Sequence, residues 1–393
     1  MRRANSAPLV ALALAVFVAG CTGGSNVPIS GVAAAPTPVP SPTATVLKLS
    51  AFALGGEQNV VPPGTANLQF TPDIHMSFQR QSDGTYKLWA SGGGAFGTFG
   101  FTTPDFLTLT SMKSAGGKPA GVLLPAGAGT TAADADYAGA GSVFPAANGT
   151  DLLMIYHAEN HLFSGTDYLV IPFYATVVLA RSSDGGLTWT KQGVIISGLD
   201  AQQATQAATG AGALTPTAIV SGGFIYVLYR EIDLQSGIDG VAIARAPVSS
   251  DGAPGSWKKY FGGSFSTPGL GGVTTPLNIV LDPTNKDLRQ PHVSFNTYLN
   301  TFLMTMVGNG GIYVLTSPDL INWSAGLLVL NAPVPDSTVN PPTTPFNWNP
   351  TIISPGQASD TASGQTGYLY YAKGTGANSF HYMYRRAFTI TGS

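Results

Sequence analysis

The sequence predicts an all-β protein, built as a five-bladed β-propeller of four-stranded blades. The first observation behind this prediction is composition. Glycine (49 residues) and proline (29 residues) make up about a fifth of the 393 residues, whereas only three glutamates and nine lysines are present, and this balance disfavours helices. The second observation is a repeated turn motif, whose aspartates are Asp105, Asp184, Asp251 and Asp319. A radial array of similar sheets produces a repeat of this kind.

Composition and charge also exclude several classes of protein. The net charge is −2 and only 10% of the residues are charged, so the basic surplus that nucleic-acid binding requires is missing. We therefore expect no nucleic-acid partner. Aromatic residues make up 10% of the chain, which excludes disorder over most of its length.

The N-terminus has the pattern of a signal peptide over residues 1–20. Arg2 and Arg3 precede an apolar run at 7–20, which ends just before Cys21, the single cysteine of the chain. Val18–Cys21 resembles the bacterial lipobox, which implies acylation of Cys21. Several acyl chains on one residue hold a protein stably at a membrane, so we expect export and anchoring, with the outer membrane or the cell surface as the location. An ordinary secretory signal with a chance cysteine is the alternative.

Residues 21–46 comprise the expected lipidated cysteine and the linker that follows it. They are rich in Pro, Ser, Thr, Ala and Gly and carry no charge, so they have little to bury and favour extended conformations. The remaining residues, 47–393, are predicted to form a single propeller domain, which we expect to be a monomer.

Short apolar strands separated by Gly, Asn and Asp turns run from about Val46 onward, and no stretch has a helical pattern. The turn at Arg181–Trp189 reads RSSDGGLTW and matches the Asp-box of sialidase-like propellers. In that motif the Ser and Asp side chains satisfy the backbone of a hairpin turn, while the tryptophan packs between blades. Its role is structural.

Degenerate copies of this turn set the period of the repeat. They contain Asp105, Asp251 and Asp319, so that the four aspartates are separated by 79, 67 and 68 residues. A further period ends near residue 386, in the last available strands, which gives five blades. A six-bladed sialidase-like propeller is one alternative, and an all-β sandwich with chance repeats is another.

The repeat also predicts which segments surround the central funnel. The innermost strands should begin at 72–76, 139–143, 215–218, 289–293 and 347–351. Because first and second strands are antiparallel, the loops after the second strands open on the same face, and these loops hold 157–161, 230–233, 309–310 and Lys373. Two of the three glutamates, Glu159 and Glu231, are therefore expected at the funnel mouth.

Carboxylates in a cleft suit glycoside cleavage, which needs one protonated acid and one carboxylate that attacks or activates water. Glu159 is the strongest candidate, although a polar strand end in which it pairs with a nearby histidine or arginine explains the same residues. Glu231 follows Arg230, and a local salt bridge or a substrate clamp is the alternative role for that pair.

Asp73 begins the innermost strand of the first blade, and here the chain resembles the five-bladed arabinanase, xylosidase and invertase clan of glycoside hydrolases. The turn Ser317–Trp323 is also similar to turns of that clan. The resemblance implies that Asp73 is a general base or nucleophile, with a tuning aspartate on the second blade and an acid glutamate on the third. This chain has Gly-Ala-Gly-Ser and Thr-Pro-Thr at those two places, so Glu159 or Glu231 would have to replace the acid.

Several further residues are candidates for substrate binding. Arginine grips carboxylates, and aromatic rings stack on sugar faces. The candidates are His75, His157, Arg230, Arg289, His292, Trp348 and Asn349, with Trp89, Tyr137, Tyr156 and Tyr229 as additional rings. His75 and His292 make a metal ion at the axis conceivable, but two histidines without a defined spacing are weak support, so we expect neither metal nor cofactor.

Two functions remain open from the sequence. One is a glycoside hydrolase tethered to the cell envelope, with a carboxylate pair among Asp73, Glu159 and Glu231 acting on oligo- or polysaccharides. The other is a non-catalytic propeller lipoprotein that binds a glycan or a protein.

Overall fold

The computed structural model describes residues 45–65, 68–92, 96–114, 116–117, 121–127, 132–161, 173–199, 210–281, 289–331, 345–375 and 380–393. They belong to one compact unit, Thr45–Ser393. The predicted signal peptide, Cys21 and nearly all of the predicted linker lie outside the described residues. Within the described part of the chain, no helix is long and apolar enough to cross a membrane.

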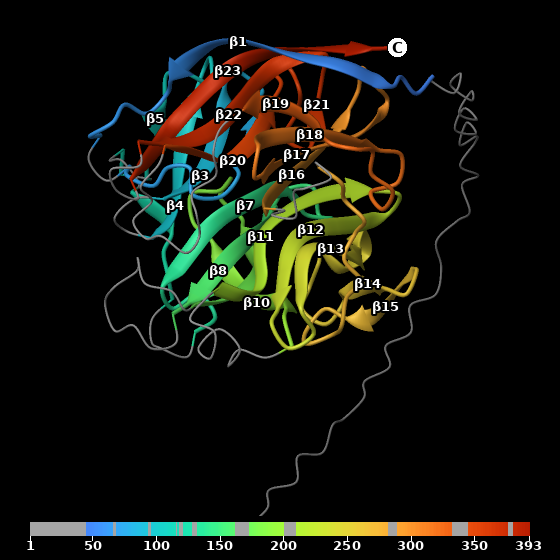
Figure 1. Ribbon diagram of the computed structural model, residues 1–393. Helices are drawn as coiled ribbons and strands as arrows, with labels where there is room; N and C mark the ends of the chain where they lie inside the picture. Colours follow the sequence, from blue (N-terminus) through green and yellow to red (C-terminus); the bar gives the residue numbers. More distant parts are fainter. Residues whose placement is uncertain are drawn as a thin grey trace, which may run out of the picture. The chain divides into compact units, whose positions relative to one another are not determined.

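The described chain is nearly all β, as the composition predicted (Figure 1). Its strands form four hydrogen-bonded sheets, which we divide into five groups. The first group contains β2 (Ser77–Arg80), β3 (Tyr86–Gly92), β4 (Gly97–Thr103), β5 (Thr110–Ser111) and β6 (Val122–Leu124). The second contains β7 (Tyr137–Pro145), β8 (Leu152–Asn160), β9 (Phe173–Ser182) and β10 (Thr190–Ser197). The third contains β11 (Gly210–Ser221), β12 (Phe224–Asp233), β13 (Ile238–Pro247), β14 (Lys258–Phe261) and β15 (Ser264–Pro268).

The last two groups complete the domain. The fourth contains β16 (Arg289–Asn296), β17 (Thr301–Gly308), β18 (Gly311–Ser317), β19 (Leu327–Asn331) and β21 (Ala362–Ser363). The fifth contains β20 (Phe346–Ile353), β22 (Thr366–Gly374), β23 (His381–Gly392) and β1 (Leu49–Asn59). The one helical segment among the described residues is a short 3-10 turn, η1 (Val248–Ser250).

We interpret each group as one blade of a β-propeller. The second and third groups are joined into one sheet, because β11 pairs in parallel with β9 at Gly210–Gly212. Within the groups, most strands that follow one another in the sequence pair antiparallel, which is the order expected of a blade. The exceptions include β6, which pairs with β4, and β21, which pairs in parallel with β16. Apart from β1 and β21, the groups follow one another along the chain.

The N-terminal strand completes the fifth group. β1 pairs antiparallel with β23 from Leu49↔Gly392 to Asn59↔Tyr384, and Figure 1 shows this strand in blue beside the red C-terminal strand. Glu57 of β1 strengthens the contact by accepting hydrogen bonds from Lys373 (2.6 Å) and from the Tyr371 hydroxyl (2.6 Å). The sequence pattern placed the domain start at residue 47 but did not predict this pairing.

A ring of hydrogen bonds joins the innermost strands around the axis. In each group, one side chain accepts a hydrogen bond from a backbone N–H of the next group, and the fifth group bonds back to the first. The five bonds are Val143 N to Ser77 Oγ (2.9 Å), Ala218 N to Ser142 Oγ (2.7 Å), Val293 N to Thr217 Oγ1 (3.1 Å), Ile352 N to His292 Nδ1 (3.4 Å) and Met76 N to Thr351 Oγ1 (3.0 Å). The side chains buried at the axis therefore link neighbouring blades.

The repeated turns carry the hydrogen bonds that their sequence predicted. Asp184 Oδ1 accepts from the backbone N–H groups of Leu187 (3.0 Å) and Thr188 (2.9 Å), and Ser182 Oγ accepts from Gly186 N (2.8 Å). The turns containing Asp105 and Asp319 have equivalent bonds. Asp251 differs, because it accepts from Ala147 N (2.7 Å) and Arg181 Nη1 (2.9 Å) and so ties its turn to the neighbouring blade.

Candidate functional site

Glu159, at the end of β8, is held by two histidines. Its Oε1 lies 2.8 Å from His157 Nε2 and its Oε2 lies 3.0 Å from His161 Nε2. Side chains two residues apart in a strand project from the same face, which places His157 beside Glu159. The glutamate side chain is 19% exposed, whereas those of His157 and His161 are 2% and 5% exposed. The carboxylate therefore reaches solvent from a buried histidine clamp.

Backbone groups orient both histidines. The N–H of Thr215, on β11, donates to His157 Nδ1 at 3.2 Å, so the ring proton of a neutral His157 is on Nε2 and is donated to Glu159. The backbone N–H of His161 donates to Asp136 Oδ2 at 2.7 Å. This clamp determines the charge of Glu159. Burial alone would raise its pKa, but the hydrogen bonds from both histidines outweigh burial and lower the pKa to about 2.

Asp73 is the second carboxyl group of the site. It lies just before β2, its N–H donates to Ser91 O at 3.2 Å, and its Oδ1 lies 3.6 Å from His381 Nε2. Its side chain is 33% exposed, so a substrate can reach it. Removal of water from the carboxyl group, together with repulsion from the Glu159 charge, raises the pKa of Asp73 to about 8, while the Tyr137 hydroxyl acts in the opposite direction.

Asp73 and Glu159 come from neighbouring blades and influence one another electrostatically. The environment favours the protonated form of one carboxyl and the ionised form of the other at neutral pH. Two carboxyl groups with pKa values driven apart are suited to supply a proton donor and an anion to the same reaction. The sequence predicted both residues, but it did not predict this division of charge.

Aromatic side chains line the neighbourhood of Asp73. His381 lies edge-on to Phe70, Phe346 and Trp348, with ring centroids 5.6, 5.9 and 5.9 Å away. Phe346 is buried, whereas Phe70 and Trp348 are partly exposed. Trp348 therefore remains a candidate for contact with a sugar ring. No sequence pattern singled out His381, because its partners come from distant segments.

Glu231, the third predicted carboxylate, lies outside this site. It is 1% exposed, and its two carboxylate oxygens bind Lys259 Nζ at 3.0 and 2.9 Å. Lys259, which is completely buried, also donates to Ser197 O on β10 at 2.8 Å. Glu231 thus forms a buried ion pair within the third blade, and the bond from Lys259 to Ser197 O ties this pair to the second blade. We therefore leave Glu231 out of the candidate active site. The ion-pair partner of Glu231 is therefore Lys259 from β14, and not the adjacent Arg230.

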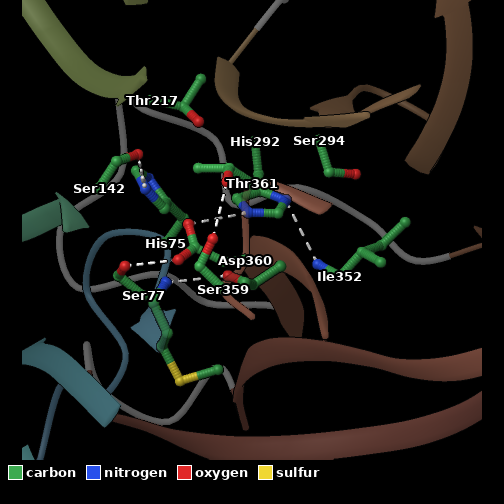
Figure 2. Close-up of polar contacts among 12 residues, drawn as sticks. His75, Ser77, Ser142, Thr217, His292, Ser294, Ile352, Ser359, Asp360 and Thr361 are labelled. Carbon is green, nitrogen blue, oxygen red and sulfur yellow. Dashed lines mark hydrogen bonds and ion pairs between the residues drawn. The ribbon is translucent and has the colours of Figure 1, made fainter. Parts of the chain in front are cut away.

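His75 and His292 lie in a buried polar cluster on the axis, shown in Figure 2. His75 Nε2 is 3.2 Å from Ser142 Oγ, the two histidine rings are 5.3 Å apart, and His292 Nε2 is 3.7 Å from Asp360 Oδ2. His75 is 3% exposed and His292 is 1% exposed, so the predicted substrate contact of these histidines is not supported. In the described part of the chain, no group of three or more His, Cys, Asp or Glu side chains is arranged to hold a metal ion.

The other predicted binding residues have different environments. Arg230 makes a bidentate ion pair with Asp239 at 2.7 and 2.8 Å, and its guanidinium is thereby neutralised. Asn349 is completely buried, so a direct substrate contact is not supported for it. Arg289, partly exposed at the start of β16, stays a prediction.

Three of the additional candidate rings belong to the core. Trp89, Tyr156 and Tyr229 are completely buried, so they cannot stack on a sugar in this conformation. Trp89 donates from Nε1 to Gly186 O of the repeated turn at 3.2 Å, which explains why the tryptophan is needed between blades.

The fold is a β-propeller, and solved structures of glycoside hydrolases share it. The catalytic domain of a GH62 alpha-L-arabinofuranosidase from Coprinopsis cinerea matches with a TM-score of 0.50 and 14% identity, covering 88% of this chain and 98% of that chain. An alpha-L-arabinofuranosidase from Lactobacillus brevis gives a TM-score of 0.51 and 14% identity, over 84% and 95% of the two chains.

A family 117 glycoside hydrolase from Zobellia galactanivorans is similar to the same extent, with a TM-score of 0.51 and 12% identity over 87% of this chain and 90% of that chain. No family model matches the sequence, and no curated protein matches it. At these low identities the likeness concerns the fold.

Proposed function

We propose that this protein is a glycoside hydrolase in which Asp73 is the general acid and Glu159 is the carboxylate that attacks or activates water. Three observations support the proposal. The fold is that of propeller glycoside hydrolases, both carboxyl groups are accessible, and their pKa values lie on opposite sides of neutrality. The placement of two partly exposed carboxyl groups on neighbouring blades, where they influence one another, carries the proposal. The opposed pKa values agree with it, because glycoside cleavage requires one protonated and one ionised carboxyl group at the same pH.

The proposed reaction begins with a proton transfer. Asp73 donates its proton to the glycosidic oxygen while the bond from that oxygen to the anomeric carbon breaks. Glu159 then either bonds to the anomeric carbon, giving a covalent intermediate that water hydrolyses, or removes a proton from the attacking water. The first route retains and the second inverts the anomeric configuration. These roles reverse those implied by the resemblance, in which the aspartate at the place of Asp73 is the base or nucleophile.

The histidine clamp supports the role of Glu159. An ionised carboxylate has about four lone-pair positions, so the bonds from His157 and His161 leave acceptor capacity on both oxygens. Because both histidines are buried, they also limit the rotation of the carboxylate. An oriented anion is suited to a reaction in which positive charge develops on the sugar.

A non-catalytic glycan-binding propeller is the second candidate, and one observation favours it. Both oxygens of Glu159 are already hydrogen bonded, as they would be in a carboxylate whose task is to hold the blade together. In that case carbohydrate would bind near Trp348 without being cleaved.

Hydrolysis distinguishes the two candidates. The full chain in mild detergent is incubated with p-nitrophenyl glycosides, starting with the α-L-arabinofuranoside, and with neutral oligosaccharides and plant or microbial polysaccharides. We expect sugar release that is lost in Asp73→Asn and in Glu159→Gln, with the product anomer observed by NMR. Binding without release from any substrate would favour the glycan-binding candidate.

We also propose that the protein is exported and anchored through acylated Cys21, at the outer membrane or the cell surface, and that it acts as a monomer on carbohydrate. The lipobox-like Val18–Cys21 supports this proposal. Cell fractionation and labelling with a radioactive fatty acid test it. Label in the parent and its loss in Cys21→Ser, with release into the soluble fraction, are the expected results; label retained in Cys21→Ser would contradict the proposal.

A further inference from the structure

The segment that carries Asp73 is fixed from two sides. On one side, the Asp73 N–H donates to Ser91 O of β3 at 3.2 Å. On the other, Asn349 of β20 donates from Nδ2 to the carbonyl of Pro72 at 2.9 Å, which is the carbonyl of the peptide bond that leads into Asp73. The first anchor lies within the same blade, whereas the second comes from the blade that closes the ring.

Asn349 is itself held by the fourth blade. Its backbone N–H donates to Gln290 Oε1 of β16 at 3.0 Å, so a continuous path runs from Gln290 through Asn349 to Pro72. Both residues have left-handed backbone conformations, with φ of 55° at Gln290 and 54° at Asn349. The pairing register of each strand shifts at this place, between Arg289 and His292 and between Trp348 and Thr351.

These left-handed conformations cost free energy for residues other than glycine, and asparagine tolerates them better than most. Backbone strain of this kind persists where the surrounding structure maintains it, and it is concentrated at functional sites. The bulge at Trp348 and Asn349 has a local consequence, because it brings the Asn349 amide to the Pro72 carbonyl instead of continuing the strand pairing. Complete burial of Asn349 means that its amide acts on protein atoms, not on a substrate.

We propose that Asn349, supported by Gln290, is a positioning residue that orients the Asp73 carboxyl group for proton transfer, and not a substrate ligand. The inference rests on the proposed function only for its effect on catalysis, since the contacts themselves are independent of the reaction. In this proposal, residues of the fourth and fifth blades position the acid of the first blade. A group placed this way affects the chemical step far more than substrate binding.

The test uses the full chain and the substitution Asn349→Gly. Glycine adopts the left-handed conformation freely, so the substitution removes the buried side chain with its amide donor but does not strain the backbone. The matched control is Asn300→Gly, which replaces another left-handed asparagine (φ 56°) in the turn between β16 and β17. We expect kcat to fall about 10- to 100-fold, the size that follows a displacement of about 1 Å, with KM within about twofold of the parent. The control should keep both constants.

A second measurement does not depend on activity. Aspartate labelled with 13C at the carboxyl carbon reports the pKa of Asp73 by NMR, the signal being assigned by its loss in Asp73→Asn. In Asn349→Gly the carboxyl gains access to water, so its pKa should fall from about 8 toward its ordinary value, while Asn300→Gly should leave it unchanged. If Asn349→Gly does not fold, Gln290→Gly, which removes the acceptor of the Asn349 N–H, should give a smaller shift in the same direction.

Each outcome decides a separate question. A raised KM with unchanged kcat would make Asn349 a substrate ligand and overturn the inference, as would an unchanged Asp73 pKa in a folded Asn349→Gly protein. If the parent hydrolyses no substrate but the pKa still falls, the positioning role stands and the proposed hydrolase function fails.

Discussion

Glu159 and Glu231 lie near the ends of the second strands of adjacent blades, yet their environments are opposite. Glu159 is ionised beside two histidines and is 19% exposed, whereas Glu231 is buried against Lys259 of the same blade. Strand register explains the difference. Ser142 and Thr217 have equivalent places in the ring of hydrogen bonds around the axis, and they pair with Ile155 of β8 and Leu228 of β12. Glu159 is four residues after Ile155, so the corresponding residue of β12 is Ile232, four residues after Leu228. Glu231 corresponds to Ala158.

A shift of one residue along a strand reverses the face on which a side chain lies. Ala158, like Glu231, is buried away from the funnel, and in β12 the glutamate at this place needs a buried lysine to compensate its charge. The comparison teaches that an ionisable residue near a strand end is a candidate site residue only when its side chain projects from the face of the strand that is turned to the axis.

The largest expected effect concerns Glu159. Replacement by Gln keeps the shape of the side chain but removes the charge, so we expect kcat/KM for the substrate to fall about 10²- to 10⁴-fold, the usual contribution of a general acid or base. Circular dichroism should show an unchanged fold. Activity within about threefold of the parent would mean that Glu159, like Glu231, is structural.

Glu231→Gln should show the reverse pattern. Breaking a buried ion pair leaves Lys259 charged and unpaired, so the free energy of unfolding should fall by about 3–5 kcal/mol, measured by denaturant unfolding. The folded fraction should keep its kcat. The double substitution Glu231→Met with Lys259→Met is the control, because an apolar pair of similar size is expected to recover much of the loss. A fall in kcat without loss of stability would return Glu231 to the active site.

The pH dependence of kcat/KM tests the division of charge. If Asp73 is the acid, activity requires its protonated form and falls about tenfold per pH unit above its pKa of about 8. The ionised form of Glu159 is present above about pH 2, so the rate should be level between these limits wherever the protein stays folded. A rate that instead rises as the pH passes 8 would assign the base role to Asp73, as the family resemblance implied.

The smallest effect is expected for His161→Asn. Loss of one histidine from the clamp raises the pKa of Glu159 from about 2 toward its ordinary value of 4.5, so the acid limb of kcat/KM should move to higher pH. The free energy of unfolding also depends on the ionisation of Glu159. The depressed pKa contributes stability that is complete above pH 4.5 and is lost as the pH falls through about 2, and the variant should lose it at higher pH. Lys258→Gln, at an exposed position on β14, is the control and should leave the acid limb in place.

Local patterns were sufficient for much of the fold. The all-β class follows from the scarcity of helix formers, and the Ser182–Trp189 turn follows from side chains that satisfy their own backbone within a few residues. The repeat also pointed to the neighbourhoods of Asp73 and Glu159, although Asp73 lies four residues before β2 and Glu159 lies within β8, not in the loop after it. The blade-closing strand β1 was not, because its pairing with β23 joins opposite ends of the chain and its residues carry no signal for a particular partner.

By itself, the sequence determined the strand content and the repeated turns, because these depend on interactions within a few residues. Only the tertiary structure decided their protonation, the partner of Glu231 and the burial of Asn349 and His292. Those properties depend on water exclusion and on groups brought together from blades far apart in the sequence, such as Asn349 and Pro72.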